Sequence, residues 1–90
     1  MSIHDGHRQR LKDRFLREGL DGFTDVQVLE LLLFYVVPRK DTNPIAHALV
    51  DRFGSLARVL DASVLKLTEV NGISDNGATF LKLVREIERR

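Results

Sequence analysis

A run of seven apolar residues, LLLFYVV at positions 31–37, constrains the fold of this chain more than any other feature. The run continues a helical pattern that begins at Thr24, so apolar side chains point in nearly every direction around one helix. Such a helix is stable in water only when other elements cover it on all sides. The sequence therefore predicts a central buried helix that ends at Pro38. The expected hub residues of the fold are Leu29, Leu32, Leu33 and Val36.

Both ends of this central helix carry local signals. Thr24 is placed to cap the first turn, and Gln27 three residues later completes a capping box. Pro38 ends the helix because the residue before a proline disfavours helical backbone angles. Tyr35, close to that end, is expected in the core.

Apolar residues elsewhere recur at spacings of three and four, not two, which indicates helices and no strands. The other expected helices cover residues 6–18 before Gly19, residues 44–53 between Asn43 as cap and Gly54, two short helices capped by Ser55 and Ser63, and residues 75–88. The inward side chains expected on them are Leu11, Phe15, Leu16, Ile45, Leu49, Val50, Phe53, Leu56, Val59, Leu60, Leu65, Leu67, Val70, Ala78, Leu81, Leu83 or Val84, and Ile87. We predict an all-α fold: five or six short helices in a compact bundle, forming one domain over residues 1–90.

Composition excludes several classes of protein. The chain has no cysteine, so it holds neither a disulfide framework nor a thiolate site. Its longest apolar run is far shorter than the roughly 20 residues of a membrane span, and its first residues lack a secretory signal. These features favour a cytoplasmic protein with no membrane partner. The net charge of +1 argues neither for nor against a nucleic-acid partner.

The segment LTEVNGIS at residues 67–74, followed by Ala78 and Leu81, resembles the helix-hairpin-helix motif. Gly72 allows a positive φ where the chain leaves one helix, and Ile73 plugs between the two helices. The next helix starts at Ser74, and its free N–H groups can hold a phosphate. Such contacts reach the DNA backbone and not the bases, so they bind without sequence preference.

Two features of this segment depart from the motif. Ser74 replaces a second glycine, and Asp75 places a negative charge where a phosphate is expected. Lys82 and Arg85, one and two turns further on, offer compensating positive charge. An ordinary tight turn between two helices is the alternative explanation of the same residues.

A second glycine joins two helices at Phe53-Gly54-Ser55-Leu56, and the spacing of the two turns resembles the tandem hairpins of the C subunit of bacterial excinuclease. The predicted DNA-binding residues are Gly72, Ile73, Ser74, Asn76, Lys82 and Arg85. Secondary candidates are Gly54, Ser55, Arg39, Lys40, Arg8 and Arg10.

Four segments together resemble the N-terminal region of bacterial RadC-like proteins. They are HDGHRQRLKDRF at residues 4–15, LELLLFY at 29–35, PRKDTNPIA at 38–46 and RFGSL at 52–56. In that family the region precedes a JAB/MPN domain whose zinc metallopeptidase-like site uses a paired-histidine motif, a glutamate and an aspartate. No His-x-His occurs in this chain. The resemblance therefore implies the N-terminal piece alone, from a family named for a DNA-repair role.

No catalytic constellation is evident in the sequence. Ser55, Ser63 and Ser74 are better explained as helix caps than as nucleophiles. His4 and His7 lack a nearby carboxylate or thiol with which to complete a zinc site. No Gly-x-x-x-x-Gly-Lys phosphate loop is present. We therefore expect no enzyme activity, no metal and no cofactor.

Two functions are compatible with these residues. The leading hypothesis is a non-enzymatic DNA-binding module that contacts the DNA backbone. The alternative is an interaction module that docks on the JAB/MPN-like domain or on another protein. A continuous basic strip joining Ser74 to Lys82 and Arg85 favours DNA. An exposed apolar patch together with an acidic hairpin surface favours docking.

Overall fold

The computed structural model describes residues 3–90, with side chains described from residue 5 onward. Over this range it contains six helices and no strand, which confirms the all-α prediction. They are α1 (Ile3–Glu18), α2 (Asp25–Leu33), α3 (Thr42–Phe53), α4 (Leu56–Asp61), α5 (Val64–Thr68) and α6 (Asp75–Arg89).

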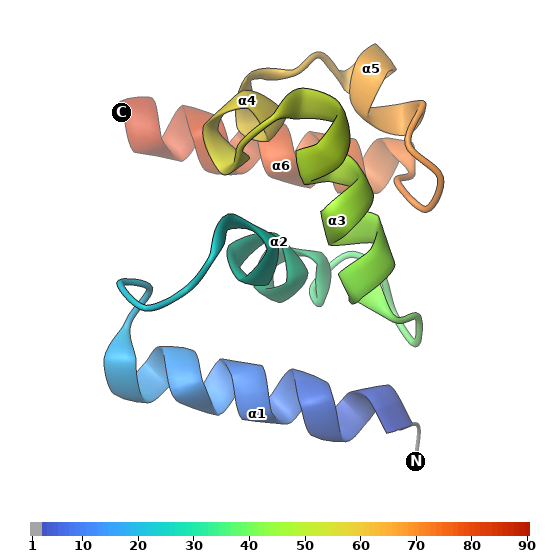
Figure 1. The fold of residues 1–90 in the computed structure, drawn as a ribbon. Coiled ribbons are helices and arrows are strands. Elements are labelled where there is room, and N and C mark those ends of the chain that lie inside the picture. The colour runs from blue at the N-terminus through green and yellow to red at the C-terminus, as the bar shows by residue number, and fades with distance from the viewer. Residues whose placement is uncertain (1–2) are drawn as a thin grey trace.

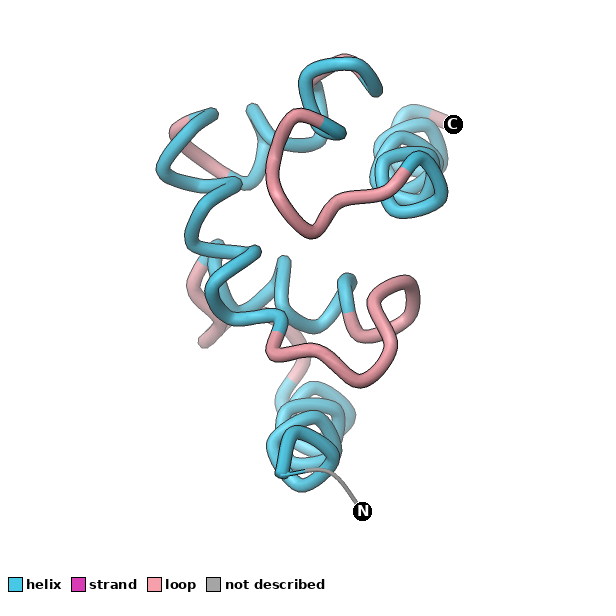
Figure 2. Tube along the Cα trace, turned by 90° about the vertical axis from the view of Figure 1, so that its right-hand side faces the viewer, coloured by secondary structure: helices cyan, strands magenta, loops and turns pink. Residues whose placement is uncertain are grey.

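The helices are stacked with α2 in the middle (Figures 1 and 2). One side of α2 carries α1, and the other side faces α6 together with α4 and α5. α3 runs obliquely between these levels and packs against both α2 and α4. Figure 2 shows α1 and α6 both nearly end-on, so the first and last helices run in similar directions on opposite sides of α2.

The buried apolar side chains form two separate clusters. The main core joins α2 to the helices above it, and its largest fully buried members are Leu29, Leu33, Leu49, Leu67 and Leu81. The second cluster lies between α1 and α2 and consists of Leu11, Leu31 and Phe34, with Phe23 packed against it. The prediction of α2 as the central helix is confirmed, because α2 contributes to both clusters.

The predicted caps of most helices are confirmed. Thr24 and Gln27 form the capping box, with the Thr24 hydroxyl accepting from Gln27 N at 3.2 Å and the Gln27 side chain accepting from Thr24 N at 3.0 Å. Ser55, Ser63 and Ser74 each accept a hydrogen bond of 3.2 Å from the amide three residues later. These contacts satisfy amides that have no acceptor within their own helix.

Three predicted helix boundaries are wrong. α1 begins at Ile3, three residues before its expected start at residue 6. The cap of α3 is Asp41, whose carboxylate accepts from Asn43 N at 3.0 Å, because the side chain of Asn43 instead donates to buried Glu30 at 2.9 Å. α2 ends at Leu33, five residues before Pro38. The chain then continues in tighter turns, in which Tyr35 N donates to Leu32 O.

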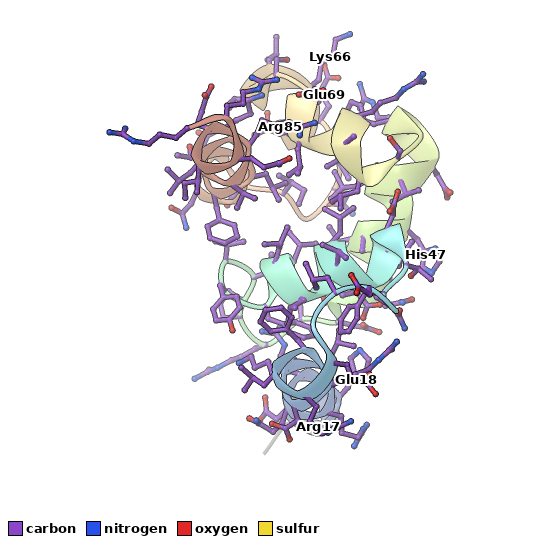
Figure 3. The ribbon with its side chains drawn as sticks, turned by 90° about the vertical axis from the view of Figure 1, so that its left-hand side faces the viewer. Arg17, Glu18, His47, Lys66, Glu69 and Arg85 are labelled. Atoms are coloured by element: carbon purple, nitrogen blue, oxygen red, sulfur yellow. The ribbon has the colours of Figure 1, made fainter. Side chains whose placement is uncertain are left out.

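Some predicted inward side chains face solvent. Leu16, Tyr35, Leu65 and Ile87 are exposed, Phe15 is just exposed, and Leu32 is half-buried. Of the two alternatives on α6, Val84 is half-buried and Leu83 is 55% exposed, because Leu83 lies on the opposite side of the helix from Leu81. Phe15, Leu16, Leu65 and Ile87 lie on α1, α5 and α6, which are outer helices covered by neighbours along only one side. Leu32 and Tyr35 belong to the central segment and are open because α1 covers that segment only in part. Arg17, Glu18 and His47 are also exposed (Figure 3).

Candidate binding surfaces

Gly72 has the geometry that the sequence predicts. Its φ is +99°, a backbone conformation that glycine adopts without strain. A Cβ at this position would lie 2.7 Å from Ile45 Cδ1 and 2.9 Å from Ile45 Cγ1, so the turn is pressed against α3. Ile73, the next residue, is buried in the main core. The turn between α5 and α6 is therefore fixed on both sides by packing.

The start of α6 presents backbone amides to solvent. The Ser74 hydroxyl accepts from Gly77 N at 3.2 Å, which leaves the preceding amides of Asp75 and Asn76 with no protein acceptor in the described structure. Both residues are exposed. The Asp75 carboxylate lies in the same first turn and opposes an incoming anion.

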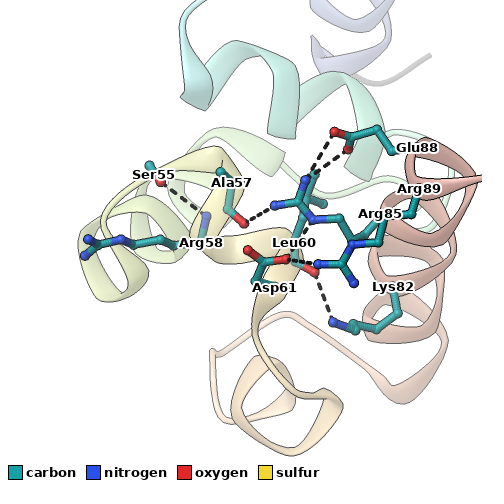
Figure 4. A network of polar contacts seen from close by, with 9 residues as sticks. All are labelled: Ser55, Ala57, Arg58, Leu60, Asp61, Lys82, Arg85, Glu88 and Arg89. Atoms are coloured by element: carbon teal, nitrogen blue, oxygen red, sulfur yellow. Dashed lines mark hydrogen bonds and ion pairs between the residues drawn. The ribbon is translucent and has the colours of Figure 1, made fainter.

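Lys82 and Arg85, the cations predicted to assist this site, are bound to α4 instead (Figure 4). Lys82 Nζ donates to Leu60 O at 3.1 Å. Arg85 donates to Asp61 at 2.8 Å and to Ala57 O at 2.7 Å, and its side chain is only 13% exposed. Its hydrogen bond is the main cause that lowers the pKa of the Asp61 carboxyl below the ordinary value of 3.8. Both cations tie α6 to α4, and they do not form a strip extending from the hairpin.

The first glycine turn has an internal anion at its helix start. Gly54 has φ +104°, and Ser55 caps α4 as predicted. The amide of Leu56 donates to a carboxylate oxygen of Asp25, at the start of α2, at 2.9 Å. Asp25 thus fills the position at which an external phosphate is expected.

The remaining basic candidates lie apart from the hairpins in the chain. Arg8 donates to the carbonyls of Phe34, Val37 and Lys40 at 3.1, 2.5 and 2.8 Å, so it holds the turns that follow α2. The side chains of Arg10, Arg39 and Lys40 are exposed, and Arg39 has a positive φ of 63°.

A buried carboxylate occupies the junction of α1, α2 and α3. Glu30 is buried, and its two oxygens lie 2.9 Å from His7 Nε2 and 2.9 Å from Asn43 Nδ2. The side chain of His4, the other histidine considered for a metal, lies outside the described residues. Among the side chains that the structure describes, no three His, Cys, Asp or Glu residues form a metal-binding group. No described helix is long and apolar enough to cross a membrane.

An open apolar groove lies between α1 and α2, and none of the sequence patterns above predicted it. It has a volume of about 200 Å³ and is lined by Phe15, Leu20, Val28, Leu31, Leu32 and Tyr35. Tyr35 is 65% exposed and Leu20 is also exposed, so the groove opens to solvent. The signal was present in the apolar run of residues 31–37, which α1 covers only in part.

The six helices and two glycine turns define a small all-α domain with an external apolar groove. The chain is similar to the UPF0758 protein FN0909 of Fusobacterium nucleatum subsp. nucleatum, with 48% identity over 84 residues. The match covers 93% of this chain and 36% of that protein, so the chain spans about a third of its length. No protein-family model and no solved structure matches the chain.

Proposed function

We propose that this chain is a helical module of a RadC-like protein and that it works without catalysis, by binding another protein chain through the groove between α1 and α2. The observation that carries the proposal is the open groove itself. The apolar side chains around the groove are in contact with water, and a partner that covers them removes this surface from water, which is favourable. The resemblance of four sequence segments to RadC-like proteins and the similarity to a UPF0758 protein support the family.

The size of the groove favours a protein ligand over a small molecule. Sites for drug-sized ligands usually enclose roughly 300–1,000 Å³. A groove of about 200 Å³ between two helices instead suits a few apolar side chains presented by another chain. Burying them contributes about 25 cal/mol for each Å² of apolar surface removed from water, from which the entropic cost of association is subtracted.

The proposal can be tested with peptides displayed on phage and selected on the immobilised chain. Selected peptides should lose binding when Leu20→Ser and Tyr35→Ser are combined, because both side chains are exposed and line the groove. They should keep binding to Leu65→Ser, which removes an equally apolar side chain, 73% exposed, on α5. Failure to select any peptide that depends on Leu20 and Tyr35 refutes a binding role for the groove.

A second candidate function is weak binding of the DNA backbone at the start of α6. The observation that favours it is the pair of amides at Asp75 and Asn76 with no acceptor among the described residues. Helix N-termini bind phosphate, and a helix-hairpin-helix interpretation of the Gly72 turn gives the same site. Since Lys82 and Arg85 are bound to α4, few cations remain for neighbouring phosphates.

A salt titration with duplex, single-stranded and branched DNA tests this second function. Affinity should be modest, and each neutralised phosphate should add about 0.9 to the slope of log affinity against log salt. Asp75→Asn should strengthen binding, whereas Asp51→Asn, which removes an exposed carboxylate on α3, is the charge-matched control. If no DNA binds in low salt and Asp75→Asn changes nothing, the turn is a structural joint.

A further inference from the structure

We propose that the chain that fills the groove is a second copy of this protein, whose α6 inserts Leu83 and Ile87 between α1 and α2 of its partner while Glu86 pairs with Lys12. This inference rests on the proposed function of the groove and names its occupant. It accounts for two exposed apolar surfaces and for two charged side chains, Lys12 and Glu86, that have no oppositely charged partner among the described side chains.

The first observation is an apolar ridge on the outer side of α6. Leu83 and Ile87 are 55% and 64% exposed, although Leu81 on the same helix is fully buried. They are four residues apart, so they lie one above the other on one face of α6. Two large apolar side chains at this spacing match the way that amphipathic helices occupy grooves.

The second observation is a cation at one end of the groove that contacts an aromatic ring but no carboxylate among the described side chains. Lys12 Nζ lies 5.1 Å from the ring centroid of Tyr35, which lines the groove. Phe15 follows Lys12 at the spacing of one helical turn, so the ammonium and the apolar wall share a face of α1. Arg14 bonds to Glu18 and Arg8 bonds to backbone carbonyls, but Lys12 has no carboxylate partner among the described side chains.

The third observation is a carboxylate beside the ridge whose charge is opposite to that of Lys12. Glu86 is exposed on α6, three residues after Leu83, and makes no hydrogen bond or ion pair in the described structure. Its neighbour Glu88 is already paired with Arg85. When Leu83 and Ile87 enter the groove of a second copy, Glu86 at the edge of the ridge is complementary to Lys12.

The end of the groove at Tyr35 lies close to α6, the helix that carries the ridge. The turns after α2, which include Tyr35, adjoin α6: a Cβ at Gly77 would lie 3.9 Å from Val36 Cγ2. Figure 2 also shows these turns on the side of the molecule that carries α6. With a two-fold axis between the two copies, each copy gives its ridge and receives its partner's, so that every contact forms twice.

Sedimentation equilibrium of the whole chain tests the inference. The average mass should rise with concentration from the 10.3 kDa of one chain toward that of a dimer. Ile87→Ser should abolish this rise, because it removes an exposed apolar side chain of the ridge. Leu65→Ser, which is exposed on α5, should leave it unchanged.

A charge exchange tests the pairing itself. Lys12→Glu or Glu86→Lys alone should weaken the dimer at least about two- to thirtyfold, since each exposed pair contributes about 0.2–1 kcal/mol and occurs twice. Combining both changes in one chain restores opposite charges across the interface and should restore the affinity. Arg17→Glu makes the same charge change as Lys12→Glu at an exposed residue toward the end of α1, and should have no effect (Figure 3).

The outcomes separate the inference from the proposed function. The self-pairing is refuted if the chain stays monomeric at its highest soluble concentration. It is also refuted if neither Lys12→Glu nor Glu86→Lys changes the affinity of the dimer. If peptides selected on such a monomer still need Leu20 and Tyr35, the groove binds a different protein and the proposed function stands. If the chain is monomeric and no selected peptide needs Leu20 and Tyr35, both the self-pairing and the proposed function of the groove are refuted.

Discussion

The clearest energetic prediction concerns Gly72. Gly72→Ala combines two costs: about 1–2 kcal/mol for an L-residue at positive φ, and about 1–3 kcal/mol for forcing Ile45 aside. The new Cβ would lie 2.7 Å from Ile45 Cδ1, closer than real Cβ contacts allow. The free energy of unfolding should therefore fall by about 2–5 kcal/mol, a large share of the roughly 5–15 kcal/mol typical of small domains.

Gly54→Ala is the matched control for this change. Its φ of +104° resembles the +99° of Gly72, but its Cβ would meet only Arg58 atoms at 3.6 Å, an ordinary contact. Gly54→Ala should lower the free energy of unfolding only by the cost of an L-residue at positive φ, about 1–2 kcal/mol. The assay is urea unfolding followed by circular dichroism, with a thermal melt in parallel, where each kcal/mol shifts Tm by roughly 4–8 °C.

A double-mutant cycle isolates the steric part of the Gly72 effect. Ile45→Val removes Cδ1, the atom nearest the new Cβ, and alone should cost about 0.5–1.5 kcal/mol. In the Gly72→Ala background it should cost less or even stabilise, because it relieves the contact. Two results refute this reasoning. One is an equal loss of unfolding free energy for Gly72→Ala and Gly54→Ala. The other is a double variant Gly72→Ala/Ile45→Val whose loss equals the sum of the two single losses.

Three further predictions follow from other contacts. Leu33→Ala should cost about 2–5 kcal/mol by urea unfolding, and Leu32→Ala clearly less, because Leu33 is fully buried and Leu32 is half-buried; equal losses contradict this. The lowered pKa of Asp61 means that its contact with Arg85 stabilises the fold above pH 3.8 and is lost as pH falls through the lowered pKa. Arg85→Gln should return that pKa toward 3.8 in an NMR titration, and an unchanged value rules out Arg85 as the cause. Arg8→Met should cost about 1.5–3 kcal/mol, since three carbonyls lose a charged donor; a variant as stable as the parent shows that water replaces the guanidinium.

Local signals predicted the helix starts well because capping depends on a few neighbouring residues. Ser55, Ser63 and Ser74 each cap the helix expected of them. The prediction of Asn43 as a cap was wrong because Asp41 and Asn43 are both suitable caps, and only the tertiary structure decides between them. Buried Glu30 engages the Asn43 amide, which leaves Asp41 to cap α3.

Periodicity predicted which helices are amphipathic but not where their neighbours end. Ile87 continues the apolar pattern of α6, yet it is exposed because no described helix covers that side. The cations near the hairpin show the same limit for the candidate site. Lys82 and Arg85 follow Ser74 closely in sequence, but the end of α4 at Leu60 and Asp61 engages them. The groove could be predicted only in part: the apolar run of residues 31–37 indicates a surface that needs covering, but the placement of α1 against α2 decides which part of it stays open.

The separation of the apolar side chains into two clusters has a consequence for how the domain opens. The cluster of Leu11, Leu31 and Phe34 holds α1 without sharing a side chain with the main core. We therefore expect α1 to open as a separate unit, with its amides exchanging with solvent through a local opening that costs less than global unfolding. Since Phe15 of α1 forms one wall of the groove, an occupant of the groove must slow the exchange of α1 amides before it slows those of α3.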